Sequence, residues 1–275
     1  MKRASIQSIK TPSTIKSLSK FENGIENTKE KKRVLGGIST KSPIQLNKKE
    51  IKKTTEQIYV QIEELHKTMR AENKHSLLLV FQGLDAAGKD GSIDKLYNGL
   101  YPMATEAHAF KAPTEDEASR DFLWRLHKLT PATGHIGIFN RSHYEDILVP
   151  SVHKLFDEKI IEKRYEHINN WEELLQDRGT VVIKFYLHIS QKEQHERFKE
   201  RKTNVEKMWK YSSNDIKESK YWDEYMEVYE KIFSKSKIKW NIIPADQKWY
   251  RDYLIAITIL ENLKKLKMEY PNKLR

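Results

Sequence analysis

The sequence contains no cysteine, which excludes disulfide bonds, thiol nucleophiles and cysteine-ligated metal sites. It also has no apolar run of the roughly 18 residues that a membrane-spanning helix needs. Met1–Arg3 is not followed by the apolar stretch of a secretory signal. Glycine and proline number only 10 and 8 among 275 residues, which excludes a collagenous chain. We therefore expect a globular protein of the cytoplasm without a membrane partner.

The positive charge is unevenly distributed along the chain. The formal net charge is +11, and such a basic chain suggests a polyanionic partner. Residues 1–53 hold 14 Lys and Arg against 4 Asp and Glu, whereas the remaining 222 residues hold 36 against 35. Residues 1–35 are polar and lack periodicity, so they predict a basic, flexible leader. Residues 36–275 then form a single domain of nearly neutral charge.

Short apolar runs alternate with segments of helical periodicity along this domain. The runs predict strands at Ser76–Gln82, Ala107–Phe110, His135–Asn140, Thr180–Leu187 and Trp240–Ile243. The segments between them predict helices at Lys48–Glu72, Lys89–Gly99, Glu115–Leu129, Asp157–Gln176, Lys192–Lys202, Lys217–Ser234 and Trp249–Met268. This alternation is typical of an α/β fold with three layers, in which helices cover both faces of a mainly parallel five-stranded sheet.

A phosphate-binding loop follows the first predicted strand. Gly83–Lys89 fits the pattern G-x-x-x-x-G-K between a buried strand and a helix. Glycines let the backbone approach a phosphate closely, and the helix N-terminus adds partial positive charge. A glycine-rich turn without a ligand is the alternative, which this context disfavours. The residues expected to bind phosphate are Gly83, Ala86, Ala87, Gly88, Lys89, Asp90 and Gly91.

Two carboxylates set this loop apart from the common pattern. Asp90 stands where a Ser or Thr that ligates magnesium usually follows the lysine. Asp85 lies within the loop, where bound phosphates would repel it unless a cation lies between them. We therefore expect Asp85 to help hold Mg²⁺, directly or through water.

A second polar cluster follows the strand that ends at Asn140. Ligands of open parallel sheets bind beyond the carboxyl ends of the strands. Arg141 can offer two parallel hydrogen bonds to phosphate oxygens, although a structural ion pair is the alternative for it. Glu145 and Asp146 are candidate ligands of Mg²⁺ or can orient the acceptor. Asn140, Arg141, Glu145 and Asp146 are together expected to bind the nucleotide, whereas His143 is expected to serve packing or indirect support.

A charged segment after the fourth strand predicts a lid over about residues 195–216. Arg197 and Arg201 lie four positions apart, on one face of a helix. A polar loop over Asn204–Asn214 follows, with Lys207, Trp209 and Lys210. Such a segment can close over phosphates and exclude water. A solvated charged helix is the alternative. The aromatic residues expected to serve core packing are Trp209, Tyr211, Tyr221, Trp222, Tyr225, Tyr229 and Phe233.

In combination, these motifs resemble the family-2 polyphosphate kinases. The matching pieces occur in the family's order over about residues 40–265. They are Phe81–Gly91, Phe110–Thr114, Asp121–Arg125, Ile138–Leu148, Glu196–Arg201 and Ile243–Trp249. This match is far more specific than a phosphate-binding loop alone.

The resemblance implies a thymidylate-kinase-like P-loop fold with a helical lid. It also implies Mg²⁺-dependent phosphoryl transfer between inorganic polyphosphate and nucleotides. Asp85 and Lys89 match the family's first phosphate motif, Asn140 and Arg141 its second, and Arg197 and Arg201 its lid arginines. The resemblance therefore implies that the catalytic residues are Asp85, Lys89, Arg141, Arg197 and Arg201. The family tends to assemble as dimers or tetramers, so a homodimer or homotetramer is expected.

The second motif carries a variant that bears on the substrate. Some family members have Phe-Asp-Arg there, whereas this chain has Phe139-Asn140-Arg141. Together with Asp90, this variant looks like the subgroup that phosphorylates both AMP and ADP, and GMP and GDP stay open as acceptors. It also shifts metal ligation from residue 140 toward Asp85 and Glu145 or Asp146.

Three other functions are compatible with parts of the sequence. An ATP-dependent nucleoside monophosphate kinase would share the fold and the phosphate loop. A nucleic-acid-binding protein could use the basic leader to contact backbone phosphates, although we do not expect a nucleic acid partner. A polyphosphate-binding protein without activity would not need both Lys89 and Arg141. Formation of ATP from ADP with polyphosphate as the sole phosphoryl donor separates these readings.

Overall fold

The computed structural model describes residues 35–271, which belong to one compact unit. Its centre is a single sheet with the strand order β2-β3-β1-β4-β5, and every neighbouring pair is parallel. The strands are β1 (Ser76–Gln82), β2 (Thr105–Ala109), β3 (Ile136–Asn140), β4 (Thr180–His188) and β5 (Trp240–Pro244). The predicted five-stranded parallel sheet is therefore confirmed, and it places the carboxyl ends of β1 and β3 side by side.

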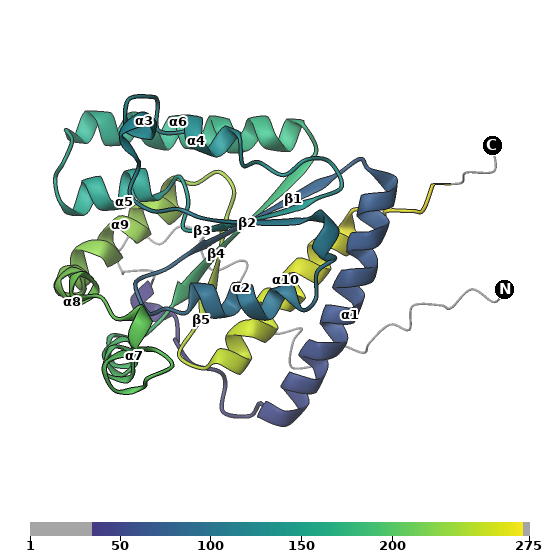
Figure 1. The fold of residues 1–275 in the computed structure, drawn as a ribbon, viewed down its shortest axis with the longest axis horizontal. Coiled ribbons are helices and arrows are strands. Elements are labelled where there is room, and N and C mark those ends of the chain that lie inside the picture. The colour runs from purple at the N-terminus through teal and green to yellow at the C-terminus, as the bar shows by residue number, and fades with distance from the viewer. Residues whose placement is uncertain (1–34, 272–275) are drawn as a thin grey trace. The chain divides into compact units, whose positions relative to one another are not determined.

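Helices cover both faces of the sheet (Figure 1). One face carries α1 (Lys48–Glu72), α2 (Lys89–Tyr97) and α10 (Lys248–Lys265). The other face carries α5 (Glu145–Val152), α6 (Glu158–Asp177) and α9 (Trp222–Lys235). The remaining described helices are α3 (Glu115–Ala118), α4 (Trp124–His127), α7 (Gln191–Thr203) and α8 (Ser213–Glu218), with 3₁₀ turns at η2 (Leu35–Gly37), η3 (Pro102–Ala104), η4 (Met208–Lys210) and η5 (Ser219–Tyr221).

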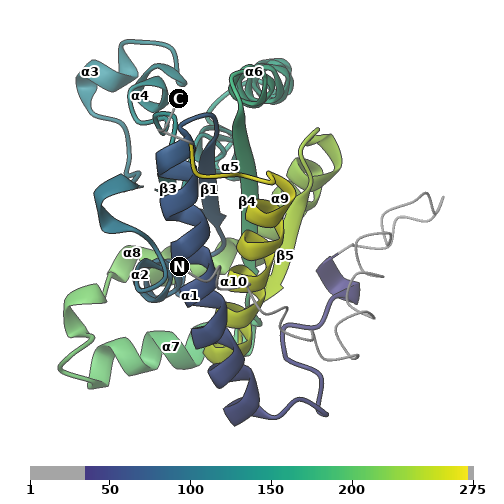
Figure 2. The ribbon, with the colours of Figure 1, turned by 90° about the vertical axis from the view of Figure 1, so that its right-hand side faces the viewer.

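The pattern of apolar residues explains why these layers form. All seven residues of β1 are buried, as expected for a central strand that is covered on both faces. The side chain of Asn47 accepts hydrogen bonds from the backbone N–H groups of Lys49 and Glu50 and so caps the start of α1. At the other end, Asn73 adopts the left-handed conformation that commonly ends a helix. Figure 2 shows α1 and α10 beside each other across one face of the sheet.

The helix predicted over Glu115–Leu129 is wrong, because the chain forms the separate helices α3 and α4 there. Thr114 and Glu117 form a reciprocal cap at the start of α3. The side chain of Asp121 then accepts a hydrogen bond from the backbone N–H of Leu123 at 3.0 Å. This local bond competes with the helical ladder and bends the chain between the two helices.

Helix α5 was not predicted, and it contains Pro150 at its sixth position. Proline has no N–H, so the carbonyl of Asp146 loses its helical partner. The Arg164 guanidinium from α6 donates a hydrogen bond to that carbonyl instead. A tertiary contact therefore allows a helix that the local sequence disfavours.

Two further expectations differ from the structure around the predicted lid. The expected loop over Asn204–Asn214 contains the turn η4 and the start of α8. The expectation of packing holds for Tyr225, Tyr229 and Phe233, which are buried, but it is wrong for others. Trp209 is 76% exposed, and Tyr211 and Tyr221 are exposed as well, because they project from the lid and from η5 instead of from the inner face of α9.

The predicted leader lies outside the described residues except for Leu35. This residue is buried in the core, and its backbone N–H donates to the Glu230 carboxylate at 3.2 Å. Ile161 and Leu175 of α6 are also buried within the protein. Between Leu35 and residue 271, none of the helices combines the length and apolarity required to cross a membrane.

Candidate functional site

The loop between β1 and α2 has the backbone conformation that its glycines permit. Gly88 has φ +102°, which side chains of L-residues rarely tolerate, and it begins α2. A Cβ atom at Gly88 would lie 2.3 Å from Nη1 of Arg251. At Gly83, a Cβ atom would lie 2.9 Å from the carbonyl oxygen of Leu187 in β4. Gly83 is therefore required by close packing against the backbone of β4, and Gly88 by its positive φ.

Lys89 points back into this loop. Its Nζ donates hydrogen bonds to the carbonyl oxygens of Gly83 at 2.6 Å and Leu84 at 3.3 Å. Burial lowers the pKa of Lys89, while the negative charge of Asp85 opposes that shift. The amino group of Lys89 is therefore held against the backbone of the loop, at the start of α2.

The two predicted phosphate motifs meet at the edge of the sheet. Strands β1 and β3 pair so that Phe81 lies opposite Asn140, which brings the residues after both strands together. Arg141 donates to Asp85 at 2.8 Å, and Asn140 donates to Asp90 at 2.8 Å. Each bond joins one residue of the first motif to one of the second.

Glu145 and Asp146 are adjacent in sequence but have different surroundings. Glu145 lies near Lys89 and Arg141: burial raises its pKa, and the two cations oppose the rise. Asp146 is instead paired with Arg125 at 3.4 Å. Burial raises the pKa of Asp146 too, against the opposing charge of Arg125. Glu145 therefore belongs to the phosphate loop's surroundings, and Asp146 belongs to a neighbouring group of cations.

Arg197 supports the phosphate loop from α7. Its Nη1 donates to the carbonyl oxygens of Ala86 and Ala87, both at 2.9 Å. Its Nη2 donates to the carbonyl oxygens of Ala245 at 2.7 Å and Asp246 at 3.2 Å, and its Nε donates to the Glu193 carboxylate. An arginine has five N–H groups, and all five are engaged in these bonds.

The remaining predicted lid residues join α7 to α8 and η4 to α2. Arg201 donates to the Asp215 carboxylate at 2.8 Å, which joins α7 to α8. Lys210 in η4 lies 3.4 Å from the Asp90 carboxylate at the start of α2. Asp90 therefore contacts the second motif through Asn140 and the lid through Lys210.

A cavity of about 840 Å³ opens beside this loop. Asp85, Arg141 and Glu145 line it at the loop end. Its wall further away carries the cations Arg125 and Arg164 and aromatic side chains such as Phe122 and Trp222. The arrangement offers cations for phosphate groups and flat apolar surfaces for a planar ring.

The predicted metal ligands do not form a preassembled cluster. In the part of the chain that the structure describes, no three acidic or histidine side chains converge in a way that could hold a metal ion. Asp85 and Glu145 are near enough that the charge of Asp85 contributes to the raised pKa of Glu145. This pair fits Mg²⁺, which is commonly bound through one or two carboxylates, substrate phosphates and water.

Comparison with known proteins identifies the family. The family model described as polyphosphate kinase 2 matches residues 45–271. The chain belongs to the polyphosphate kinase 2 family. It is 42% identical over 213 residues to an AMP/ADP-polyphosphate phosphotransferase of Meiothermus ruber, which covers 76% of this chain and 80% of that protein. It is 39% identical over 225 residues to an ADP-polyphosphate phosphotransferase of Rhodopseudomonas palustris, which covers 76% and 78%.

A solved structure agrees with this assignment. The crystal structure of polyphosphate kinase 2 from Arthrobacter aurescens superposes with a TM-score of 0.86 at 35% identity, covering 90% of each chain. The family predicted from the motifs and the P-loop kinase fold are therefore confirmed. Membership of this family favours polyphosphate over the ATP-dependent alternative considered from the sequence.

Several residues of this polyphosphate kinase site were not singled out from the sequence. Arg251 packs against Gly88, and Gln194 donates to the backbone carbonyl of Asp85 at 3.0 Å. Arg125 and Arg164 gather around Asp146. Arg125 lies within one matching piece, Asp121–Arg125, so that signal was available. No local pattern marks Arg251, Gln194 or Arg164, because their partners are distant in the sequence.

Proposed function

We propose that this polyphosphate kinase transfers phosphoryl groups from inorganic polyphosphate to both AMP and ADP. The observation that carries the proposal is the meeting of the Lys89 loop with Arg141 and two carboxylates at the mouth of a cavity lined by cations. The names of the Meiothermus ruber and Rhodopseudomonas palustris relatives support AMP and ADP as acceptors.

Catalysis in this site depends on placement and charge. The acceptor is already an anionic phosphate oxygen, so little help from a general base is needed, and electrostatic stabilisation dominates. Lys89 and Arg141 neutralise oxygens of the phosphoryl group in transfer, and the loop from Gly83 to Gly91 surrounds it. Arg125 and Arg164 bind phosphates of the nucleotide. The lid closes over the reacting groups and excludes water.

Mg²⁺ is the cofactor that the carboxylates fit. Asp85 and Glu145 would hold it, and it would supply charge neutralisation between donor and acceptor oxygens. Asp146 takes a different part: it holds Arg125, and through its backbone carbonyl Arg164, against the nucleotide.

This division between the two carboxylates is testable. Glu145→Gln is expected to raise the Mg²⁺ concentration needed for half-maximal activity by about tenfold. Loss of a side chain that supports a metal site commonly weakens metal binding by at least this factor. Asp146→Asn is expected to raise KM for the nucleotide instead and to leave the Mg²⁺ requirement unchanged. Magnesium titrations at saturating nucleotide measure the first effect. Equal Mg²⁺ requirements in Glu145→Gln and in the unaltered enzyme would contradict the assignment of Glu145.

The overall function is tested by supplying polyphosphate as the only phosphoryl donor. AMP should yield ADP, and ADP should yield ATP, while GMP and GDP measure the base preference. Lys89→Ala is expected to lower kcat by about 100-fold or more with little change in Tm, because Lys89 acts on the transferring group. Product formation from ATP and AMP alone, with none from polyphosphate, would overturn the proposal.

A further inference from the structure

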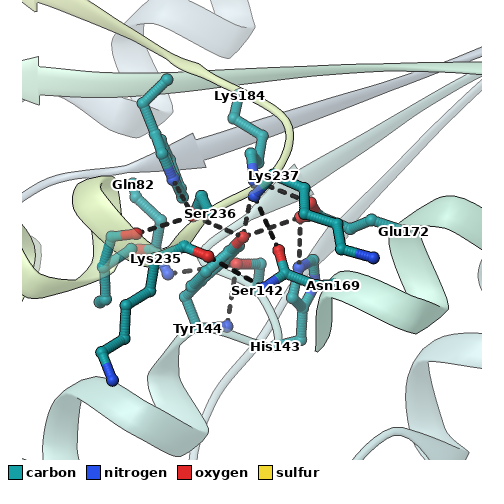
Figure 3. Close-up of polar contacts among 12 residues, drawn as sticks. Gln82, Ser142, His143, Tyr144, Asn169, Glu172, Lys184, Lys235, Ser236 and Lys237 are labelled. Atoms are coloured by element: carbon teal, nitrogen blue, oxygen red, sulfur yellow. Dashed lines mark hydrogen bonds and ion pairs between the residues drawn. The ribbon is translucent and has the colours of Figure 1, made fainter. Parts of the chain in front are cut away.

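A cluster of buried polar side chains surrounds His143 and Tyr144, which follow the second phosphate motif in the chain (Figure 3). Lys184 of β4 donates to the Glu172 carboxylate of α6 at 2.7 Å and to the Tyr144 hydroxyl at 2.6 Å. The Tyr144 hydroxyl donates to Glu172 at 3.0 Å. Nε2 of His143 lies 3.1 Å from the same carboxylate oxygen. Two residues of the motif segment are thus bound to one ion pair.

The cluster is removed from water. Glu172 and Tyr144 are each 1% exposed, and His143 and Lys184 are 0% exposed. Burial opposes ionisation of Glu172, yet the hydrogen bond from His143 and the charge of Lys184 outweigh it, so the pKa of Glu172 lies below its usual value. Because an ionised carboxylate only accepts hydrogen bonds, His143 donates to it.

Stability alone gives no reason for an ion pair at this position. Buried ion pairs can often be replaced by apolar residues of similar volume without loss of stability. The buried Lys184 therefore needs an explanation other than stability. Its cluster holds His143 and Tyr144, which lie between Arg141 and Glu145 in the chain.

The segment from Arg141 to Glu145 has a shape that needs support. Arg141 adopts the left-handed conformation with φ +61°, which is uncommon for residues other than glycine and persists where surrounding contacts enforce it. Ser142 accepts hydrogen bonds from Nε2 of Gln82 at 3.2 Å and from the backbone N–H of Tyr144 at 3.3 Å. Ser142, His143 and Tyr144 are buried, while Arg141 and Glu145 line the cavity.

We propose that Glu172 and Lys184 are positioning residues, which fix Arg141 and Glu145 in the phosphoryl-transfer site by anchoring His143 and Tyr144. The proposal rests on the roles proposed above for Arg141 and Glu145. Glu172 and Lys184 do not line the cavity and act only through the segment that they hold.

Replacement of the ion pair by apolar residues separates positioning from stability. The double variant Glu172→Leu, Lys184→Met removes both buried charges together and is expected to fold. Its Tm should fall by only a few degrees, because the loss of partners for His143 and Tyr144 is offset by the removal of two buried charges. Its kcat should nevertheless fall by about 10- to 100-fold, because Arg141 and Glu145 are displaced. The KM for polyphosphate should change less than kcat. A variant with normal kcat and KM would overturn the proposal.

A control variant and a double-mutant cycle test for other causes of lost activity. The hydroxyl groups of Ser76 and Thr180 form a buried pair at 2.8 Å. The two residues begin β1 and β4, so they lie at the end of the sheet away from the phosphate loop. Thr180→Val disturbs buried polar contacts there and should leave kcat unchanged. In an Arg141→Ala background, Glu172→Gln should cause less additional loss than it does alone, since part of its effect acts through Arg141. Fully additive losses would contradict the proposed route.

A crystal structure of the double variant tests the positioning role without an activity measurement. We expect the Arg141–Asp85 contact and the left-handed conformation of Arg141 to be lost. Retention of both would overturn the positioning role even if the enzyme used another phosphoryl donor. Failure of the proposed function would instead appear in the unaltered protein, as absent transfer from polyphosphate.

Discussion

Arg197 binds backbone on two sides and does not line the cavity. The carbonyl oxygens of Ala86 and Ala87 are drawn toward its guanidinium. In a trans peptide, the carbonyl and the following N–H point in opposite directions. The N–H of Gly88 is thereby turned away from Arg197. This placement favours a positioning role, in which Arg197 fixes the backbone of the phosphate loop.

The variant Arg197→Lys tests this role. A lysine keeps the charge but has three donors and no planar fork, so it cannot hold both the loop and the Ala245–Asp246 carbonyls. We expect kcat to fall by about 10- to 100-fold and Tm to fall as well. Lys199→Ala is the matched control, since Lys199 is on the same helix, is exposed and pairs only with Glu196. A normal kcat in Arg197→Lys would show that the loop is held without the guanidinium fork.

The residue types of the site could be predicted from the sequence, but many of their partners could not. Lys89 and Arg141 stand in recognisable patterns next to buried strands, and the structure brings both to one edge of the sheet. Arg197 was assigned to the lid motif, yet most of its partners are backbone carbonyls from two distant segments. Every residue has a carbonyl, so such partners leave no signal in the sequence.

At the scale of elements, burial decided which predictions succeeded. Strands β1, β3, β4 and β5 were predicted because each contains an apolar run bounded by polar residues. Strand β2 has the sequence Thr-Glu-Ala-His-Ala and no buried residue, and it was predicted only from the short run Ala107–Phe110. Helices α1, α6 and α10 were predicted because their apolar faces repeat over many turns. The short helices α3, α4 and α5 depend instead on one or two contacts, such as the Arg164 guanidinium that binds the carbonyl of Asp146. A few residues with tertiary partners carry too little periodicity to reveal a helix.

The lid is joined to the phosphate loop at two places that differ in strength. The first half of α7 is fixed, because Gln194 and Arg197 both bind backbone of the loop. The segment from η4 onward contacts α2 through the exposed pair of Lys210 and Asp90. Exposed ion pairs contribute at most about 1 kcal/mol, so this contact is easily broken and remade. It is therefore the part of the predicted lid that we expect to open and close.

Removal of this contact should disturb closure more than folding. In Lys210→Ala, we expect an unchanged Tm and a KM for polyphosphate raised by several-fold. We also expect more phosphate released to water per nucleotide phosphorylated, because a lid that closes poorly admits water. Parallel assays of free phosphate and of nucleotide product measure this ratio. Lys207→Ala is the control, as Lys207 pairs with Glu200 inside the lid; an equal leak in both variants would argue against the Asp90 contact.

At the scale of the whole molecule, net charge is a poor guide to the site. Residues 1–34 hold nine Lys and Arg against three Asp and Glu, a net charge of +6 out of +11 for the chain. The cavity and phosphate loop depend instead on a few cations, each faced by a carboxylate or a carbonyl. A near-neutral domain can therefore bind a polyanion through the placement of a few cations, and we expect the excess charge to act only by long-range attraction.

Truncation of the chain tests this separation of charge from catalysis. A variant beginning at Val34 should keep its kcat and Tm, because the family model matches residues 45–271 and every residue of the candidate site lies within that range. Its KM for long polyphosphate should rise by no more than a few-fold, and added salt should abolish the difference, since screening removes long-range attraction. Leu35→Ala in the same truncated protein is the contrasting variant. It should cost about 2 kcal/mol of stability, because this side chain is buried in the core. Loss of turnover in the protein beginning at Val34 would instead place part of the active machinery in the basic leader.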